Sequence, residues 1–354
     1  GYTDTNGKYI DHIGKILIDS NGNTYALGGH GLVQMNPYLV GKSHWMIYKI
    51  NSAGTVLWQQ NARGPYEDPD PYYARNWITS AALSADELSL YVSGAMSTSF
   101  DWTNAGLLSI NTTSGIILTT RILTKGVLDD FEILVASDIG TDLSGNVYFI
   151  GNGGDYTTGS NTLFTVKMDF TLNLMLWEKR LHPSIWNQPV SLEKLLVASN
   201  GTVTASGHIG RNNTMPAVQH YDIVTVRYNS AGTKLFQNEI ASPSPTKYMT
   251  LKNQTVEANG STKLAIQAEF YATNKLDMIA FTIGNTGTVT KSALYNSTGN
   301  MNDFVNSALV DNGGDMIAFG NSSPYLGQVM NLNLVKLKLS PVIFNGGPKA
   351  MSTL

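Results

Sequence analysis

Polar and apolar residues alternate along most of this chain in short runs that end at Gly, Asn, Asp or Ser. A period of two residues bounded by turn-forming residues is typical of β-strands. One set of runs follows a first kind of tight turn, at 24–27, 88–92, 147–150, 202–205, 263–266 and 316–319. A second set follows a longer variable segment, at 45–50, 106–110, 163–168, 222–228, 277–283 and 333–339. The best candidate for helical periodicity, residues 192–197, is short, so the pattern predicts an all-β protein.

The tight turns repeat in pairs along the chain. The first turn of a pair occurs at Gly22, Gly145, Gly201 and Gly314, with degenerate versions at Asp86-Glu87 and Gly260-Ser261. The second occurs at Gly54, Gly115, Gly232 and Gly287, with versions that lack glycine near Asn173 and Pro341. The result is about six copies of a unit of roughly 55–60 residues. Four antiparallel strands in each unit predict a single six-bladed β-propeller, or a seven-bladed one if a further degenerate unit is present.

Two segments of the third unit carry a resemblance to a known family. Residues 145–151 read G-N-V-Y-F-I-G, and residues 165–177 read T-V-K-M-D-F-T-L-N-L-M-L-W. They resemble the β-propeller repeats of bacterial and phage-type secreted proteins, in which a G-N-x-Y hairpin precedes a K-x-x-x-x-G-x-x-x-W hairpin. The resemblance spans nearly the whole chain and implies the fold alone. Propellers include lyases, sialidases, quinoenzymes and binding scaffolds, so it implies no particular activity.

We expect one domain, because no charged or Pro/Gly/Ser-rich linker interrupts the repeats. The propeller is assigned to residues 1–344 and a tail to residues 345–354. The last unit leaves only Val342–Phe344 for its fourth strand, whereas Lys8–Ile10 has no other assignment. Because closure removes exposed sheet edges, we expect residues near Tyr2–Ile10 to complete the last blade.

Composition restricts the classes of partner. Charged residues make up only 14% of the 354 residues, the formal net charge is −3, and Lys and Arg form no cluster, so we expect no nucleic-acid partner. The absence of cysteine excludes disulfides and thiolate chemistry. No apolar stretch reaches the ~18 residues of a transmembrane helix. The Asn, Thr and Gly richness is typical of extracellular or virion proteins, and a first residue other than Met predicts that a signal peptide or upstream domain is missing.

The connections differ in length, which predicts the functional face. Long connections are disproportionately functional, and we expect them at residues 28–44, 62–76, 151–162, 182–190, 207–221, 241–247 and 320–331. Their aromatic, acidic and histidine side chains suit a glycan or a protein partner, because rings stack on apolar sugar faces. The candidate binding residues are Tyr66, Asp70, Tyr72, Tyr73, Tyr156, Trp186, Tyr325, His30 and His208. The alternative is that the aromatic residues fill gaps between blades.

Other candidate sites have simpler interpretations. His30 with His44, and His208 with His220, flank two long connections, but their spacing matches no metal motif, so we expect hydrogen bonds to backbone. The segment around Asp19 predicts an Asx turn rather than a calcium loop, since it lacks the distal Glu. Two further turns resemble the Asp-box of sialidases but carry asparagine, at Asn51 and Asn229, and no arginine triad is evident. We expect neither a metal nor a cofactor.

Three functions remain open. The first is a non-catalytic surface or virion component, such as a phage-tail receptor-binding domain or a secreted adhesin, whose partners are a cell-surface glycan or protein and other virion proteins. The second is a polysaccharide lyase or glycosidase that uses loop acids with a tyrosine or histidine as base; the acids are Glu67, Asp68, Asp70 and Asp155. The third is a self-assembling filament or capsid subunit.

Overall fold

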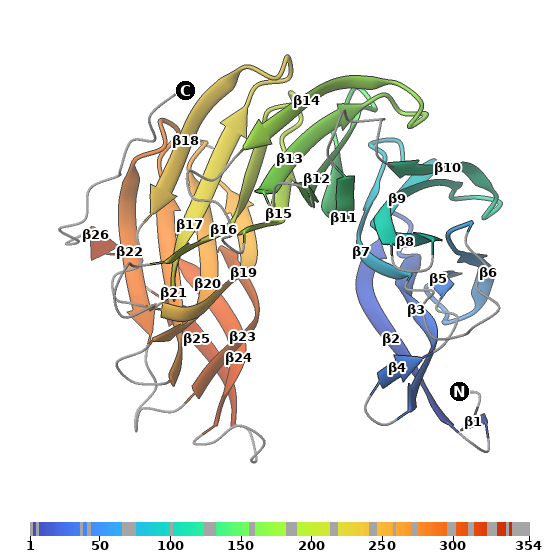
Figure 1. Ribbon diagram of the computed structural model, residues 1–354, viewed down its shortest axis with the longest axis horizontal. Helices are drawn as coiled ribbons and strands as arrows, with labels where there is room; N and C mark the ends of the chain where they lie inside the picture. Colours follow the sequence, from blue (N-terminus) through green and yellow to red (C-terminus); the bar gives the residue numbers. More distant parts are fainter. Residues whose placement is uncertain are drawn as a thin grey trace. The chain divides into compact units, whose positions relative to one another are not determined.

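The computed structural model describes most of the chain as β-strands joined by turns (Figure 1). The described residues are 3–4, 7–35, 38–40, 44–65, 76–99, 102–123, 132–155, 160–181, 190–212, 219–240, 246–257, 260–270, 275–295, 302–310, 315–323, 331–337 and 340–341. These ranges contain no helix, which confirms the predicted all-β class. Nor do they contain a helix that could cross a membrane. The chain divides into two compact units, Gly1–Leu181 with Val197–Gly201, and His182–Leu196 with Thr202–Leu354.

Three antiparallel sheets lie in the first unit. The first sheet has the order β1–β2–β3–β5–β6, with β4 paired to β3, and the other two have four strands each. Its strands are β1 Thr3–Asp4, β2 Gly7–Ile18, β3 Thr24–Met35, β4 Tyr38–Val40, β5 His44–Ile50 and β6 Val56–Ala62. The second sheet comprises β7 Trp77–Leu83, β8 Ser89–Ser99, β9 Trp102–Asn111 and β10 Ile117–Leu123. The third comprises β11 Glu132–Thr141, β12 Val147–Asp155, β13 Ser160–Met168 and β14 Met175–Leu181.

The remaining sheets follow the same order of strands in the second unit, apart from the last residues of β15. The fourth sheet comprises β15 Val190–Val197, β16 Val203–Asn212, β17 Gln219–Tyr228 and β18 Lys234–Ile240. The fifth comprises β19 Thr246–Val256, β20 Thr262–Phe270, β21 Lys275–Ile283 and β22 Val289–Tyr295, with β26 Ser340–Pro341 paired to β22. Three strands of the sixth are described: β23 Asn302–Val310, β24 Met316–Ser323 and β25 Asn331–Leu337. Repeated antiparallel sheets of four strands confirm the predicted β-propeller class, and the number of blades stays a prediction.

Glycine conformations confirm the predicted series of turns. Eight glycines at these turns have positive φ: Gly22, Gly54, Gly115, Gly145, Gly201, Gly232, Gly260 and Gly287. Two degenerate turns place a residue with a side chain in the same left-handed region, Glu87 with φ 58° and Leu172 with φ 62°. Gly314 lies outside the described residues. The tight turns join the first strand to the second and the third to the fourth, so each four-stranded sheet has a tight-turn end and a long-connection end.

Residues 192–197 belong to β15, as the predicted all-β class requires. Three expectations need correction. The strands run further into the predicted long connections, since β3 continues to Met35 and β16 to Asn212. The segment expected to close the last blade pairs instead in the first sheet, where Thr3 lies opposite Lys8 and Tyr9 opposite Val33. Pro341, expected in a turn of the last unit, pairs with β22. The single-domain assignment of residues 1–344 stays a prediction, and the tail lies outside the described residues.

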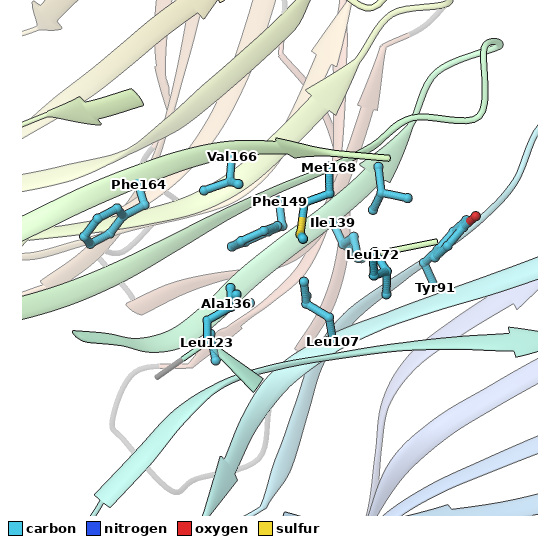
Figure 2. Close-up of a cluster of buried hydrophobic side chains, with 12 residues drawn as sticks. Tyr91, Leu107, Leu123, Ala136, Ile139, Phe149, Phe164, Val166, Met168 and Leu172 are labelled. Carbon is cyan, nitrogen blue, oxygen red and sulfur yellow. The ribbon is translucent and has the colours of Figure 1, made fainter. Parts of the chain in front are cut away.

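Buried apolar side chains fill the space between neighbouring sheets. Figure 2 shows the cluster between the second and third sheets, in which Tyr91 and Leu107 meet Phe149 and Val166. Each comes from the buried positions of an alternating run, so burial follows directly from the pattern of period two. A corresponding cluster joins the first two sheets, and another lies in the second unit.

A β-bulge recurs in the first strand of the sheets. In five sheets the register shifts by one residue after the pairs Ile13–Gly28, Ile78–Gly94, Ala136–Gly151, Leu251–Ile266 and Val305–Gly320. The bulged residues are therefore Gly14, Thr79, Ser137, Lys252 and Asn306. In the fourth sheet, a Cβ placed on Gly207 would overlap the carbonyl oxygen of Ser191, just as one on Gly94 would overlap that of Trp77. Glu193 therefore occupies the bulge position of the fourth sheet. Bulges redirect side chains and are common near functional sites.

Candidate functional site

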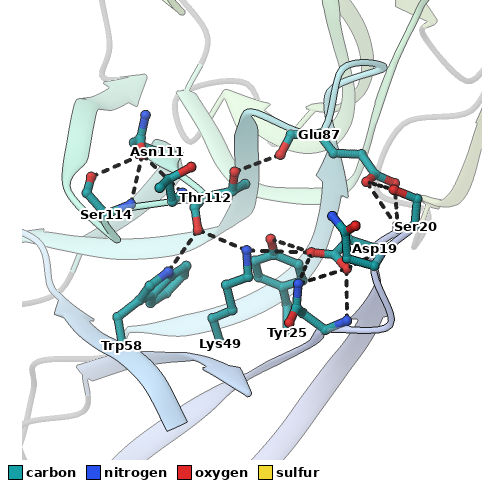
Figure 3. A network of polar contacts seen from close by, with 12 residues as sticks. Asp19, Ser20, Tyr25, Lys49, Trp58, Glu87, Asn111, Thr112 and Ser114 are labelled. Carbon is teal, nitrogen blue, oxygen red and sulfur yellow. Dashed lines mark hydrogen bonds and ion pairs between the residues drawn. The ribbon is translucent and has the colours of Figure 1, made fainter. Parts of the chain in front are cut away.

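The tight-turn end of the first sheet carries a network of polar contacts (Figure 3). The carboxylate of Asp19 accepts hydrogen bonds from the backbone N–H groups of Asn21 and Asn23, at 3.0 and 2.8 Å. The side-chain amide of Asn23 and the hydroxyl of Tyr25 also donate to it, and Lys49 Nζ lies 3.5 Å from Oδ2. Burial alone would raise the pKa of Asp19, but the hydrogen bonds from Asn23 and the charge of Lys49 outweigh it and hold the pKa below its usual value.

The third sheet repeats this arrangement. Asp142 accepts from Asn146 N at 2.9 Å, from Asn146 Nδ2 at 2.8 Å and from the hydroxyl of Tyr148 at 2.9 Å. Lys167 Nζ lies 5.2 Å from the centre of the Tyr148 ring, and Trp177 packs edge-on against the same ring. The hydrogen bond to Asp142 and burial both raise the pKa of the Tyr148 hydroxyl. This explains the G-N-x-Y and K…W motifs: they build one cross-strand row of Tyr, Lys and Trp behind an Asx turn.

The same rows connect neighbouring sheets. The carbonyl oxygen of Thr112, in the second turn of the second sheet, accepts from Lys49 Nζ at 3.1 Å and from Trp58 Nε1 at 2.9 Å (Figure 3). Trp58 also packs on Gly115, where an added Cβ would come within 2.8 Å of the indole ring. At the first turns, the carboxylate of Glu87 accepts from Ser20. The polar groups of this end of the sheets therefore hold the sheets together.

This result decides between the interpretations of two turns. The Asp19 turn is the Asx turn that the sequence predicts, since its oxygens accept from the turn's own groups. Asn51 Oδ1 accepts from the N–H groups of Ala53 and Thr55, and Asn229 bonds its own turn in the same way. Among the described residues, no group of three or more His, Cys, Asp or Glu side chains could hold a metal ion.

In the fourth sheet, the row consists of Thr204, Arg227 and Phe236 in place of Tyr, Lys and Trp. Arg227 donates to the hydroxyl of Thr204 at 2.8 Å, to the carbonyl of Gly260 at 2.8 Å and to the hydroxyl of Thr262 at 2.6 Å. Its guanidinium lies over the Phe236 ring, and burial lowers its pKa. One arginine thus takes over the connection to the fifth sheet, through groups that the sequence motif does not contain.

The bulge position of one sheet faces the first strand of the next. The hydroxyl of Thr79 donates to the carbonyl of Ala136, the residue before the bulge of the third sheet. A Cβ on Gly14 would lie 3.5 Å from the carbonyl of Ile78, the equivalent residue of the second sheet. Glu193 Oε2 accepts from the backbone N–H of Leu251, the equivalent residue of the fifth sheet. The residue at this position is therefore a glycine in the first sheet, a hydroxyl that donates to a carbonyl in the second and a carboxylate that accepts from an N–H in the fourth.

Glu193 belongs to the cluster that we identify as the candidate site, Glu193–His208–Tyr221. His208 Nδ1 lies 3.0 Å from Glu193 Oε1, and both side chains are largely buried. The ring of Tyr221 packs edge-on against the imidazole, with centroids 5.3 Å apart. Tyr221 is the third residue of β17 after the long connection, and Glu193 is the fourth of β15. A carboxylate close to an imidazole, with a phenol ring beside it, can bind a polar ligand or move a proton.

Two lysines lie close in sequence to the bulges of the fourth and fifth sheets. Lys194 follows Glu193, and Lys252 occupies the bulge of β19. Both are half-buried, and neither forms a hydrogen bond or ion pair with any residue in the described ranges. Burial lowers the pKa of Lys252 most, the charge of Glu193 raises it and the charge of Lys194 lowers it further.

Of the nine predicted binding residues, the structure describes the surroundings of His208 alone. His208 lies in a strand with its Nδ1 3.0 Å from a carboxylate oxygen of Glu193, and the expected hydrogen bond to backbone stays a prediction. His30 lies in β3 opposite His44 of β5, and His220 lies in β17 opposite Arg211. The other predicted binding residues lie outside the described residues: Tyr66, Asp70, Tyr72, Tyr73, Tyr156, Trp186 and Tyr325. Glu193 and Tyr221 were missed, because only the folded structure brings them near His208.

Comparison with known proteins supports the fold. No family model and no curated protein matches the sequence. A polysaccharide lyase, an ulvan lyase, matches with a TM-score of 0.50 at 10% identity, over 94% of this chain and 79% of that one. The β-propeller domain of the Trilobed protease from Pyrococcus furiosus gives 0.48 at 8% identity, over 96% and 84%. An endo-arabinase from Bacteroides thetaiotaomicron gives 0.38 at 10% identity, over 96% of each chain. The chain thus has a fold similar to that of the ulvan lyase, and its family is not identified by sequence.

Proposed function

We propose that this protein is a binding propeller of an extracellular surface or virion and that the long-connection end of its sheets binds a polysaccharide. The supporting observation is the Glu193–His208–Tyr221 cluster, which lies in the part of the fourth sheet near its long connections. Aromatic rings beside a few fixed polar groups are typical of ligand sites. At the tight-turn end, by contrast, the described polar groups bond to neighbouring sheets. A phage-tail receptor-binding or decorating domain, or a secreted adhesin, would use such a surface.

A polysaccharide lyase is the second candidate function. The same cluster favours it, because a carboxylate behind an imidazole and an adjacent phenol are groups that can accept and donate protons. The similarity in fold to an ulvan lyase is consistent with this alternative and does not establish it. Assembly into a filament or capsid stays a prediction.

The two functions are separated by measuring binding and cleavage on the same polysaccharides. We expect saturable binding on an array of bacterial and algal polysaccharides, with no new reducing or unsaturated ends after prolonged incubation. His208→Gln and Tyr221→Phe should weaken binding about tenfold. Release of ends that either substitution abolishes would establish the lyase instead. If the protein neither binds nor cleaves any of these polysaccharides, both functions are contradicted.

The aromatic residues of the second long connection provide an independent test. If Tyr72 and Tyr73 contact the ligand, Tyr72→Ala and Tyr73→Ala should each weaken binding by about 1–3 kcal/mol. The free energy of unfolding should change by less than about 0.5 kcal/mol, as is usual for surface substitutions. A lower melting temperature with unchanged binding would assign these rings to packing between sheets.

A further inference from the structure

The outer strand of the first sheet, β6, ends that sheet and carries no charged residue (Figure 1). β6 pairs with β5, and no strand in the described ranges pairs with its other side. Its sequence, Val-Leu-Trp-Gln-Gln-Asn-Ala, also lacks proline and glycine, and Val56 and Leu57 expose 52% and 51% of their surface. Backbone N–H and C=O groups along the edge of a sheet need hydrogen-bond partners, so an edge strand of this composition readily pairs with another chain.

The other described outer strands carry the protection that β6 lacks. β10 contains Arg121, β14 contains Glu178–Arg180, and β18 begins with the exposed Lys234. β22 is covered by β26. Charged residues and covering strands are the usual protection against pairing between sheet edges. Among the outer strands that the structure describes, β6 is therefore the one that is open to another chain.

The fifth sheet shows that an outer edge of this fold accepts a further strand. β26 lies antiparallel to β22 and pairs Ser340 with Ser292 and Pro341 with Lys291. Each described outer strand begins with a β-bulge, which carries Thr290 in β22. In the four sheets where no described strand covers the outer edge, the bulged residue is a leucine with 44–56% of its surface exposed: Leu57, Leu118, Leu176 or Leu235. An added strand can therefore lie beside this bulge and also cover apolar surface there.

We propose that β6 pairs antiparallel with β6 of a second copy of this chain, so that the two first sheets form one continuous sheet. A two-fold axis at Gln59 lets all seven residues pair: Gln59 faces the partner's Gln59, and Leu57 faces the partner's Asn61. No charged residue meets a like charge in this arrangement, whereas β14 paired with itself about its middle residue would oppose two Glu178 carboxylates. The amide of Gln59 both donates and accepts, so it can bond the same amide of the partner. This pairing lies at the outer edge and does not depend on the proposed function.

The register is tested by cross-linking, which is specific because the chain contains no cysteine. In the proposed pair only position 59 faces itself, with Cα atoms about 4.5–5.5 Å apart, which is within reach of a disulfide. Gln59→Cys should therefore form an intermolecular disulfide rapidly under mild oxidation, as non-reducing electrophoresis measures. Asn61→Cys is the matched control, because both positions are exposed but the two copies of residue 61 lie about 14 Å apart. Cross-linking of Gln59→Cys that is no faster than that of Asn61→Cys would overturn the proposal.

Charged variants test the same pairing without a covalent bond. Gln59→Lys and Gln59→Glu each place two like charges opposite one another, so each should weaken self-association at least tenfold. An equimolar mixture of the two variants should restore association, because opposite charges then face one another. Thr120→Lys is the control, since Thr120 is exposed and occupies the position of β10 that corresponds to Gln59. Circular dichroism and the melting temperature establish that each variant is folded.

Analytical ultracentrifugation of the whole chain measures the association. Over concentrations from about 1 μM to 1 mM, which span weak to moderate dissociation constants, we expect an equilibrium between one and two copies. A single copy throughout this range would overturn the proposal. Association that Gln59→Lys leaves unchanged, or that Thr120→Lys weakens as much as Gln59→Lys does, would place the contact elsewhere and overturn it as well. Because no polysaccharide is present, failure of the proposed function leaves the result of this experiment unaffected.

Discussion

The first and third sheets use their ionisable residues differently from the fourth and fifth. In the first and third, an aspartate, a tyrosine and a lysine converge at the tight-turn end, as in Asp19, Tyr25 and Lys49. The bulge positions there carry Gly14 and Ser137. In the fourth and fifth, Arg227 and the ion pair of Lys263 with Glu257 stand at the tight-turn end without the aspartate and tyrosine of that motif, and further ionisable groups stand near the bulges as Glu193 and Lys252. One repeat can therefore devote its polar groups to joining sheets or present them at a site.

The largest effect should come from the buried arginine between the fourth and fifth sheets, where Gln254 makes one further hydrogen bond, to the carbonyl of Thr204. Arg227→Met removes three hydrogen bonds, to Thr204, Gly260 and Thr262, and we expect a loss of about 3 kcal/mol in the free energy of unfolding. Lys49→Met should cost only about 1 kcal/mol, since Trp58 still donates to Thr112 and Asn23 still donates to Asp19. Urea denaturation measures both. Equal losses of free energy of unfolding for Arg227→Met and Lys49→Met would show that these two residues connect their sheets equally strongly.

The second-largest effect should come from glycines in the second and fourth sheets, at which the first two strands of the sheet approach one another closely. Gly94→Ala and Gly207→Ala each place a Cβ onto a carbonyl oxygen of the first strand, and a backbone atom cannot move aside as a side chain can. We expect each to destabilise the protein by about 2 kcal/mol. Gly54→Ala is a useful contrast, because a Cβ there meets no atom within 4 Å and the cost comes only from its φ of +84°. A smaller loss at Gly94 than at Gly54 would contradict the overlap.

The third effect is a dependence of the free energy of unfolding on pH, which should come from Asp19 in the first sheet. The pKa of Asp19 lies below its usual value, so the folded state favours the carboxylate. Its contribution is complete above the ordinary pKa of 3.8 and is lost as the pH falls through the lower, folded value. Asp19→Asn should cost about 1 kcal/mol at pH 7 and flatten the acid side of the stability curve. Asn51→Ala, at a neutral turn of the same sheet, should lower the free energy of unfolding at every pH without changing its slope against pH on the acid side.

The smallest effect should be a gain in stability. Gly14→Ser brings a hydroxyl within reach of the carbonyl of Ile78, as Thr79 does for Ala136 in the next sheet. Gly14 has no positive φ that a side chain would strain. We expect about 0.5–1 kcal/mol of added stability, from one hydrogen bond and from lower entropy of the unfolded chain. Thr79→Ala should lose a similar amount. A destabilised Gly14→Ser would mean that the two bulges differ in conformation.

Local rules made most of the fold predictable. Alternation placed the second and third strands of every sheet, because a strand with one buried face must repeat every two residues. Glycine spacing placed the tight turns, because a left-handed residue is needed at each. The errors arose where local signals are weak. Edges such as Lys8–Ile10 and Pro341 can pair with any free strand, so their partner depends on distance in the folded chain.

The candidate site was found only in part. His208 stood out as a histidine near a long connection, and its true partner, Glu193, lies in the preceding strand. No motif marks Glu193, since a bulge depends on the pairing of two strands and leaves little trace in either sequence.

The sequence by itself therefore determined what depends on neighbouring residues: the strands, the turns and the class of fold. It also determined the Asx turn at Asp19, whose partners lie within six positions. Only the tertiary structure decided which repeats are joined by Arg227 or by Trp58, and where Glu193 and His208 meet. The physical reason is that electrostatic and hydrogen-bond energies depend on distance in space, and in a chain of repeats the residues of adjacent sheets are separated by a whole unit of sequence.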